Sequence, residues 1–132
     1  YAEYALSNVV ETSVKLYFMK NEDKNEDVMR RAEVIEQIKD IIRRVAPTAK
    51  TILYGSQARN EARVDSDIDL LILLDGEKMT LEEEEAITLP LYELELKTGV
   101  SISPIVMLKK LWENRPFKTP FYINVTNEGI VL

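Results

Sequence analysis

The sequence has 132 residues, of which 45% are hydrophobic and 30% are charged, and its formal net charge is −6. This length suits one small domain with its own core, and no apolar run is long enough to span a membrane. Cysteine and histidine are both absent, which excludes disulfides, thiolate catalysis, a Ser-His-Asp triad and nearly every transition-metal site. The negative charge argues against binding long nucleic acid by counterion release. Chemistry must therefore use carboxylates, hydroxyls, Lys, Arg and a metal that prefers oxygen ligands.

The N-terminal part is predicted to lie outside the domain. Residues 1–18 are moderately helical in pattern but lack a clear cap, and the polar stretch from Met19 is typical of a solvated linker. The sequence leaves open whether Met19 is the natural start. We predict that residues 1–26 are an extension or lead-in and that residues 27–132 form the domain. The lack of cysteine and of a secretory leader pattern predicts a cytoplasmic protein.

The first half of the domain is predicted to run helix, strand, short helix, strand. Apolar residues keep helical spacing over residues 27–45, and Pro47 ends that helix. Residues 51–54 (TILY) predict a short strand. The segment 55–59 (GSQAR) predicts a turn into a short helix, and 67–74 (DIDLLILL) predicts a mostly buried strand.

A longer helix is predicted next. Thr80 and Glu83 have the spacing of a capping box, and the helix should run towards Lys97. Pro90 lies inside this helix and is expected to kink or split it. Gly99 is expected to close it.

The remaining chain predicts one strand and two helices. Residues 100–107 (VSISPIVM) predict a strand that Pro104 should push to an edge or bulge. Residues 108–115 predict a short helix, and Pro120 and Gly129 mark the start and end of another, before the terminal IVL. This order predicts an α+β fold in which helices pack against a small mixed β-sheet.

The chemistry-bearing feature is an acidic pair at the start of a buried strand. Residues i and i+2 of a strand face the same way, so Asp67 and Asp69 should project together while Ile68 and Leu70 take the other face. Two adjacent carboxylates repel unless a cation lies between them. Mg²⁺ suits such a pair because it accepts one or two carboxylates and keeps waters or substrate phosphates as its other ligands.

A phosphate-binding turn precedes the acidic pair. Gly55 lets the backbone turn tightly after a strand and approach an anion, and Ser56 with the following amides opens a helix. Arg59 is one turn further on and can reach the same charge. A phosphate held at this turn and a metal held at the next strand would meet the needs of phosphoryl transfer.

Each half of this motif also has a simpler structural explanation. Asp-x-Asp is common at strand starts, and Gly-Ser alone is more often just a turn. The stretch from Asp65 imitates an EF-hand loop, but Leu70 and Gly76 occupy the positions where that loop needs Gly and Glu. A Walker phosphate loop is absent as well. The joint pattern of strand, Gly-Ser, Ala-Arg and Ser-Asp-x-Asp is far more specific than its parts.

With its GSQAR and SDIDLLI segments, the chain resembles the DNA polymerase beta-like nucleotidyltransferase superfamily, and most closely its small stand-alone members, the minimal nucleotidyltransferases. The order of elements fits from about residue 27 to residue 107. The resemblance implies the polymerase beta-like fold and Mg²⁺-dependent transfer of a nucleoside monophosphate from a triphosphate, such as ATP, to an acceptor hydroxyl. Asp67 and Asp69 would bind the metal and act in catalysis, and the nucleotide would contact the residues Gly55, Ser56, Arg59 and Ser66.

The chain departs from the family pattern at one position. Family members usually carry a third acid on the following strand, where the same-facing candidates here are Ser101 and Ser103. Serine is no base at neutral pH without assistance. Glu93 and Glu95 precede this strand and could substitute only if the chain brings them round.

Three functional hypotheses therefore stand. The first is an enzyme that needs a helical partner protein or a second copy to recognise its acceptor, because the chain is short. The second is a non-catalytic nucleotide-binding or partner-binding module of the same fold, which lacks the third carboxylate. The third is a structural, antitoxin-like subunit of a toxin–antitoxin pair. In addition, aromatic residues near the C-terminus are expected to form core under the last helix, with a protein interface as the alternative. They are Trp112, Phe117, Phe121 and Tyr122.

Overall fold

The computed structural model describes residues 26–132, so the expectations for residues 1–18 and Met19 lie outside the described residues. Residues 34–132 form one compact unit. Residues 26–45 are helical, as their spacing predicts, and this helix ends before Pro47. Within the described part of the chain, no helix is both long and apolar enough to cross a membrane.

A four-stranded mixed sheet forms the centre of the unit and confirms the α+β prediction. Its order is β3-β2-β1-β4; β1 is antiparallel to β2 and β4, whereas β2 and β3 are parallel. The edge position predicted from Pro104 is confirmed, because β3 is an outer strand. The two-residue β4 is a strand that the sequence did not predict. The strands are β1 (Lys50–Tyr54), β2 (Ile68–Leu74), β3 (Ile102–Leu108) and β4 (Ile130–Val131).

Four helices connect these strands, and the two longer ones begin at side-chain caps. The Thr80 hydroxyl accepts a hydrogen bond from the Glu83 N–H (3.1 Å), and Gly99 closes that helix with φ of 71°. The Thr119 hydroxyl accepts from the Tyr122 N–H (3.2 Å) at the start of the last helix. The helices are α2 (Gly55–Ala58), α3 (Leu81–Thr98), α4 (Lys109–Glu113) and α5 (Pro120–Glu128).

Pro90 does not split α3, which runs as a single helix of 18 residues. Proline removes one main-chain donor and crowds the preceding turn. Ile87 and Leu91, on either side of Pro90, are both buried in the same core. Burial of both turns against the sheet therefore outweighs the local cost of the proline.

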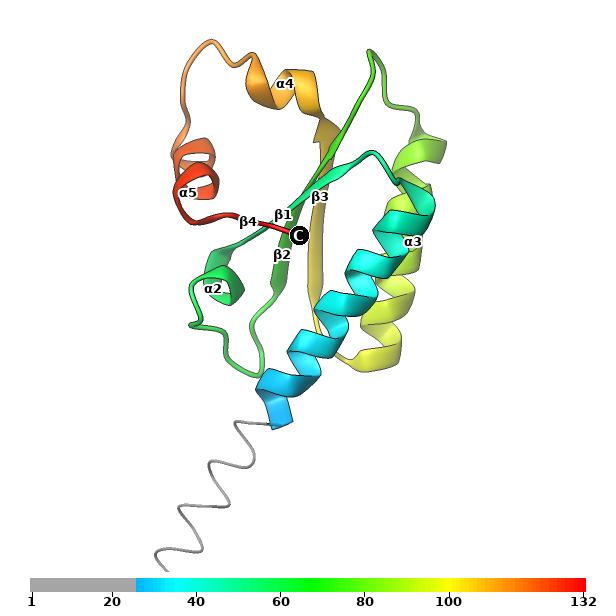
Figure 1. The fold of residues 1–132 in the computed structure, drawn as a ribbon, viewed down its shortest axis with the longest axis vertical. Coiled ribbons are helices and arrows are strands. Elements are labelled where there is room, and N and C mark those ends of the chain that lie inside the picture. The colour runs from blue at the N-terminus through cyan, green and yellow to red at the C-terminus, as the bar shows by residue number, and fades with distance from the viewer. Residues whose placement is uncertain (1–25) are drawn as a thin grey trace, which may run out of the picture. The chain divides into compact units, whose positions relative to one another are not determined.

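The helices cover the two faces of the sheet unequally. Residues 34–45 and α3 lie on one face, and α4 and α5 lie on the other (Figure 1). The first face buries a large aliphatic core that includes Ile38, Leu70 and Leu91. On the second face, a smaller cluster surrounds Leu71 and Trp112.

The aromatic prediction is right in part. Trp112 is buried, and its ring meets the ring of Phe121 edge-on with centroids 5.8 Å apart. Tyr122 packs against the same cluster. Phe117 is 72% exposed, so its assignment to the core was wrong. It lies in the connection between α4 and α5 rather than on a helix face turned towards the sheet.

Candidate functional site

The candidate site begins where β1 turns into α2. Gly55 follows the last residue of β1 and has φ of 75°, a conformation that residues with a side chain rarely adopt. A Cβ atom placed on Gly55 would lie only 2.3 Å from Asp69 Oδ2. Glycine is therefore needed here for two reasons: the turn itself, and the close approach of the Asp69 carboxylate to the backbone.

The acidic pair lies beside this turn. Asp69 is on β2, half-buried and opposite Tyr54 in the β1–β2 register, while Asp67 is exposed just before the strand. Burial raises the pKa of the Asp69 carboxyl above its usual range, the negative charge of Asp67 raises it further, and Arg59 opposes the rise. Burial and the charge of Asp69 likewise raise the pKa of Tyr54. The charge of Asp67 therefore acts on the Asp69 carboxyl. The strand predicted over residues 67–74 begins one residue later, at Ile68, so Asp67 precedes β2 and does not alternate with Asp69 within it.

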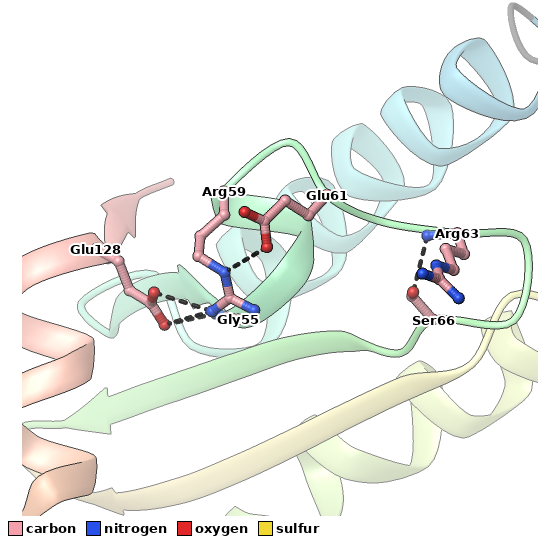
Figure 2. Close-up of polar contacts among 6 residues, drawn as sticks. All are labelled: Gly55, Arg59, Glu61, Arg63, Ser66 and Glu128. Atoms are coloured by element: carbon pink, nitrogen blue, oxygen red, sulfur yellow. Dashed lines mark hydrogen bonds and ion pairs between the residues drawn. The ribbon is translucent and has the colours of Figure 1, made fainter.

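Arg59 lies at the C-terminal end of α2 and contacts two carboxylates. Its Nη1 donates to Glu128 Oε1 (3.1 Å) and Oε2 (2.9 Å), and its Nε donates to Glu61 Oε2 (3.0 Å). The N–H of Gly55 also donates to Glu128 Oε1, at 3.3 Å. Figure 2 shows the Glu128 carboxylate, from the end of α5, facing the Arg59 guanidinium beside Gly55. A main-chain amide and a guanidinium therefore share one anion.

Ser66 and Ser56 form local hydrogen bonds with the main chain of neighbouring residues. The Ser66 hydroxyl accepts from the Arg63 N–H at 2.8 Å and stabilises the loop before β2. Figure 2 shows this pair apart from the group around Arg59. Ser56 is half-buried in α2, and its carbonyl accepts from the Glu61 N–H at 2.9 Å. The proposed contacts of both serines with nucleotide stay predictions.

The positions considered for a third acid lie at the start of β3 and at the end of α3. Ser103 is the register partner of Asp69 in the parallel β2–β3 pair, and the Ser101 carbonyl accepts from the Ile68 N–H at 2.8 Å. Glu95 Oε1 accepts from the Ile102 N–H at 2.8 Å and so caps the start of β3. Ser103 therefore occupies the strand position nearest to Asp69 on that side, and Glu95 is engaged elsewhere.

Asp67 and Asp69 could supply two of the ligands of a magnesium ion. Among residues 26–132, no group of three or more acidic side chains is arranged to hold a metal ion. Asp67 and Asp69 offer two carboxylates whose mutual repulsion a divalent cation would relieve. Mg²⁺ accepts such incomplete protein sites because phosphate oxygens and waters supply its remaining ligands. The donor set thus suits a metal that arrives with a phosphate compound.

Glu128 is the residue that sequence reasoning missed. It is separated from Gly55 by 73 positions along the chain, and its side chain is 24% exposed. The only local signal was the predicted helix end at Gly129, which gives no direction for the preceding side chain. Its place at the site depends on β4 pairing with β1, and that strand was not predicted either.

The chain is similar to several known proteins. A family model described as a nucleotidyltransferase domain matches residues 35–132. Two proteins of Methanocaldococcus jannaschii, both named "Putative protein adenylyltransferase", are similar to the chain. The first is 35% identical over 103 residues, which cover 74% of this chain and 97% of the relative. The second is 40% identical over 83 residues, which cover 63% and 76%.

A solved structure is also similar to the chain. It is described as a "putative nucleotidyltransferase from Sulfolobus solfataricus" and is 16% identical in sequence. The match has a TM-score of 0.48 and covers 80% of this chain and 84% of the other.

Proposed function

The chain belongs to the nucleotidyltransferase domain family, and from this premise we propose that it transfers AMP from ATP to a hydroxyl group of a protein, with Mg²⁺. The printed names of both Methanocaldococcus relatives support the choice of an adenylyl group and of a protein acceptor. The acidic pair supports the choice of metal, because its charges need a cation to offset them.

One observation carries the proposal: the Asp69 carboxylate lies against the Gly55 turn, so close that a Cβ atom on Gly55 would approach its Oδ2 to 2.3 Å. A metal bound by Asp69 and Asp67 would then be next to phosphates bound at Gly55 and Arg59. Transfer of a phosphoryl or nucleotidyl group depends mainly on positioning and on offsetting charge. This juxtaposition supplies both.

The proposed reaction is an in-line displacement at the α-phosphorus of ATP. The acceptor hydroxyl oxygen forms a bond to that phosphorus, and the bond to the oxygen that bridges the α- and β-phosphorus breaks. Pyrophosphate leaves with the electron pair, and the hydroxyl proton passes to solvent. Asp67 and Asp69 would hold Mg²⁺, which when bound offsets the charge of the phosphates and of the departing pyrophosphate.

The chain's own residues hold the triphosphate in this scheme. The Gly55 N–H and the Arg59 guanidinium already bind one anionic group, the Glu128 carboxylate, so they are arranged to donate to phosphate oxygens. Ser56, next to Gly55, would add a hydroxyl. The half-buried position of Asp69 limits the water around the reacting charges and strengthens their interactions.

The test is transfer of labelled AMP from α-labelled ATP to proteins of a cell extract, with and without Mg²⁺. We expect Asp67→Asn and Asp69→Asn each to lower incorporation more than about 100-fold, since each removes a charge that the transition state needs. Asp75→Asn is the matched control, because Asp75 is exposed and follows the other end of β2. Labelling that survives the Asp69 substitution would refute the proposal.

The position of Ser103 supports a second candidate. Ser103, not a carboxylate, stands opposite Asp69 on the strand where the resemblance leads us to expect a third acid. The protein would then be a non-catalytic module that binds nucleotide or a partner, as an antitoxin-like subunit would. Such a module should bind ATP in the presence of Mg²⁺, with a similar affinity for the analogue in which a methylene group replaces the oxygen between the α- and β-phosphorus, and should label no protein.

Recognition of the acceptor would need surface beyond this small domain. We propose that a helical partner protein or a second copy of the chain provides it. Light scattering on the purified protein, alone and after incubation with extract, distinguishes these two sources. A monomer that labels an added acceptor without forming any complex would contradict both.

A further inference from the structure

Glu128 accepts hydrogen bonds from the same donors that would bind phosphate in the proposed function. Its Oε1 accepts from the Gly55 N–H (3.3 Å) and from Arg59 Nη1 (3.1 Å), and its Oε2 accepts from the same Nη1 at 2.9 Å (Figure 2). A carboxylate and a phosphate oxygen make the same kind of charge-assisted hydrogen bond to these donors. One anion cannot use them while the other does.

The local structure fixes Glu128 at this position. It is the last residue of α5, and the chain turns at Gly129 directly into β4. A Cβ atom on Gly129 would lie 2.4 Å from the Val125 carbonyl oxygen and 2.6 Å from Ile52 Cγ2, so the turn leaves no space for a side chain. Pairing of β4 with Ile52 and Leu53 of β1 then holds the end of α5 beside the site.

The contact brings a third negative charge to the acidic pair. Glu128, like Asp67, raises the pKa of the Asp69 carboxyl, and Arg59 acts in the opposite direction. A triphosphate arriving at the same turn would bring several more negative charges within a short distance. Coulomb repulsion then adds to the direct competition for the donors.

We propose that Glu128 is an internal anionic ligand of the phosphate-binding groups, which a nucleoside triphosphate must displace and which thereby sets the affinity for nucleotide. The proposal rests on the proposed function, because it takes the incoming ligand to be a triphosphate. Affinity falls in proportion to the fraction of molecules whose binding groups are free. Removing the Glu128 charge should therefore tighten binding.

The experiment compares wild type with Glu128→Gln by calorimetric titration with Mg²⁺-ATP, with inorganic tripolyphosphate and with adenosine. We expect the variant to bind ATP and tripolyphosphate about tenfold more tightly and to bind adenosine as wild type does. Glu61→Gln is the matched control: Glu61 also accepts from Arg59, at 3.0 Å, but Glu128 alone of the two accepts from the Gly55 N–H. Its affinity should change less than about twofold.

The outcomes separate this inference from the proposed activity. If Glu128→Gln binds ATP no more tightly than wild type, the inference is overturned, whether or not AMP transfer occurs. If no phosphate compound binds either protein, the inference and the proposed activity are both overturned. If binding tightens but no acceptor is ever labelled, the inference stands and the proposed activity fails. A loss of labelling together with unchanged affinity would instead make Glu128 a participant in the reaction and would overturn the inference.

A measurement on wild type covers the case in which the variant does not fold. In a sample with ¹³C-labelled glutamate carboxyl groups and ¹⁵N-labelled backbone, titration with tripolyphosphate should shift the Gly55 amide and the Glu128 carboxyl resonances with the same midpoint. A Gly55 shift with a stationary Glu128 resonance would refute displacement.

Discussion

On one face of the sheet, residues 34–45 and α3 cover an aliphatic core that includes Leu70, whereas the shorter α4 and α5 on the other face cover a smaller, aromatic-rich cluster that includes Leu71. The candidate site opens on the second face. Asp69 projects to the same side of β2 as Leu71, because alternate strand residues share a face.

The two faces of the sheet differ in the charged side chains that they bury. Half-buried charge is costly, and the second face carries the half-buried carboxylates of Asp69 and Glu128. The core cluster of the first face consists of aliphatic side chains. We conclude that the first face provides most of the stability that allows the second to keep repelling carboxylates close together.

The largest expected effect tests this division of stability directly. Leu70 and Leu71 are adjacent, chemically identical and both 0% exposed, but they face opposite sides of the sheet. We expect Leu70→Ala to lower the free energy of unfolding by about 4 kcal/mol and Leu71→Ala by about 2.5 kcal/mol, since the shorter helices on the second face can relax into the cavity. Urea denaturation measures both. Equal losses, or a larger loss for Leu71→Ala, would contradict the comparison.

A second, smaller effect is the difference in stability lost when Gly55 and Gly76 are each replaced by alanine. Gly55 and Gly76 both have positive φ, 75° and 109°, but a Cβ on Gly76 meets only the Lys78 carbonyl oxygen, at 4.0 Å. Gly76→Ala should therefore cost only backbone strain, about 1–2 kcal/mol. Gly55→Ala should cost more, because its Cβ would also displace the Asp69 carboxylate.

The readout for this pair is thermal unfolding with and without Mg²⁺-ATP. We expect the ligand to raise the melting temperatures of wild type and of Gly76→Ala by similar amounts, and to leave that of Gly55→Ala nearly unaffected. Equal stabilisation of both variants would show that the approach of Asp69 to Gly55 is unimportant for binding.

Local signals in the sequence predicted most of the fold. Helical spacing located the helix through Val45, the Thr80 cap and Gly99 bounded α3, and strand alternation placed Asp69 opposite the aliphatic face. Each of these features depends on neighbours within a few positions. Strong local patterns of this kind persist because packing reinforces them.

The features that were missed depend on contacts between distant segments. The two-residue β4 has no periodicity of its own and exists because β1 offers a free edge. Glu128 reaches Gly55 only through that pairing. Of the kink or split predicted at Pro90, the split does not occur, for a similar reason: burial of Ile87 and Leu91 holds the helix together. Tertiary packing decided all three, and single-sequence patterns do not contain it.

The smallest expected effect concerns the pH dependence of stability. Burial first, then the charge of Asp67, raises the pKa of Asp69 in the folded protein above its unfolded value. The folded state therefore binds this proton more tightly, so the Asp69 contribution to stability is present at low pH and is lost as pH rises from the unfolded pKa through the folded one. At neutral pH, where the carboxylate is charged, it destabilises the fold.

Asp69→Asn should consequently melt at a slightly higher temperature than wild type at pH 7, and the difference should shrink as pH is lowered to 3. Asp65→Asn, on the exposed loop before β2, is the control and should follow wild type at both values. Added Mg²⁺ should raise the melting temperature of wild type but not of Asp69→Asn, because the cation relieves a repulsion that the amide no longer has. A variant less stable than wild type at pH 7 would mean that Asp69 contributes to the fold of the second face instead of straining it.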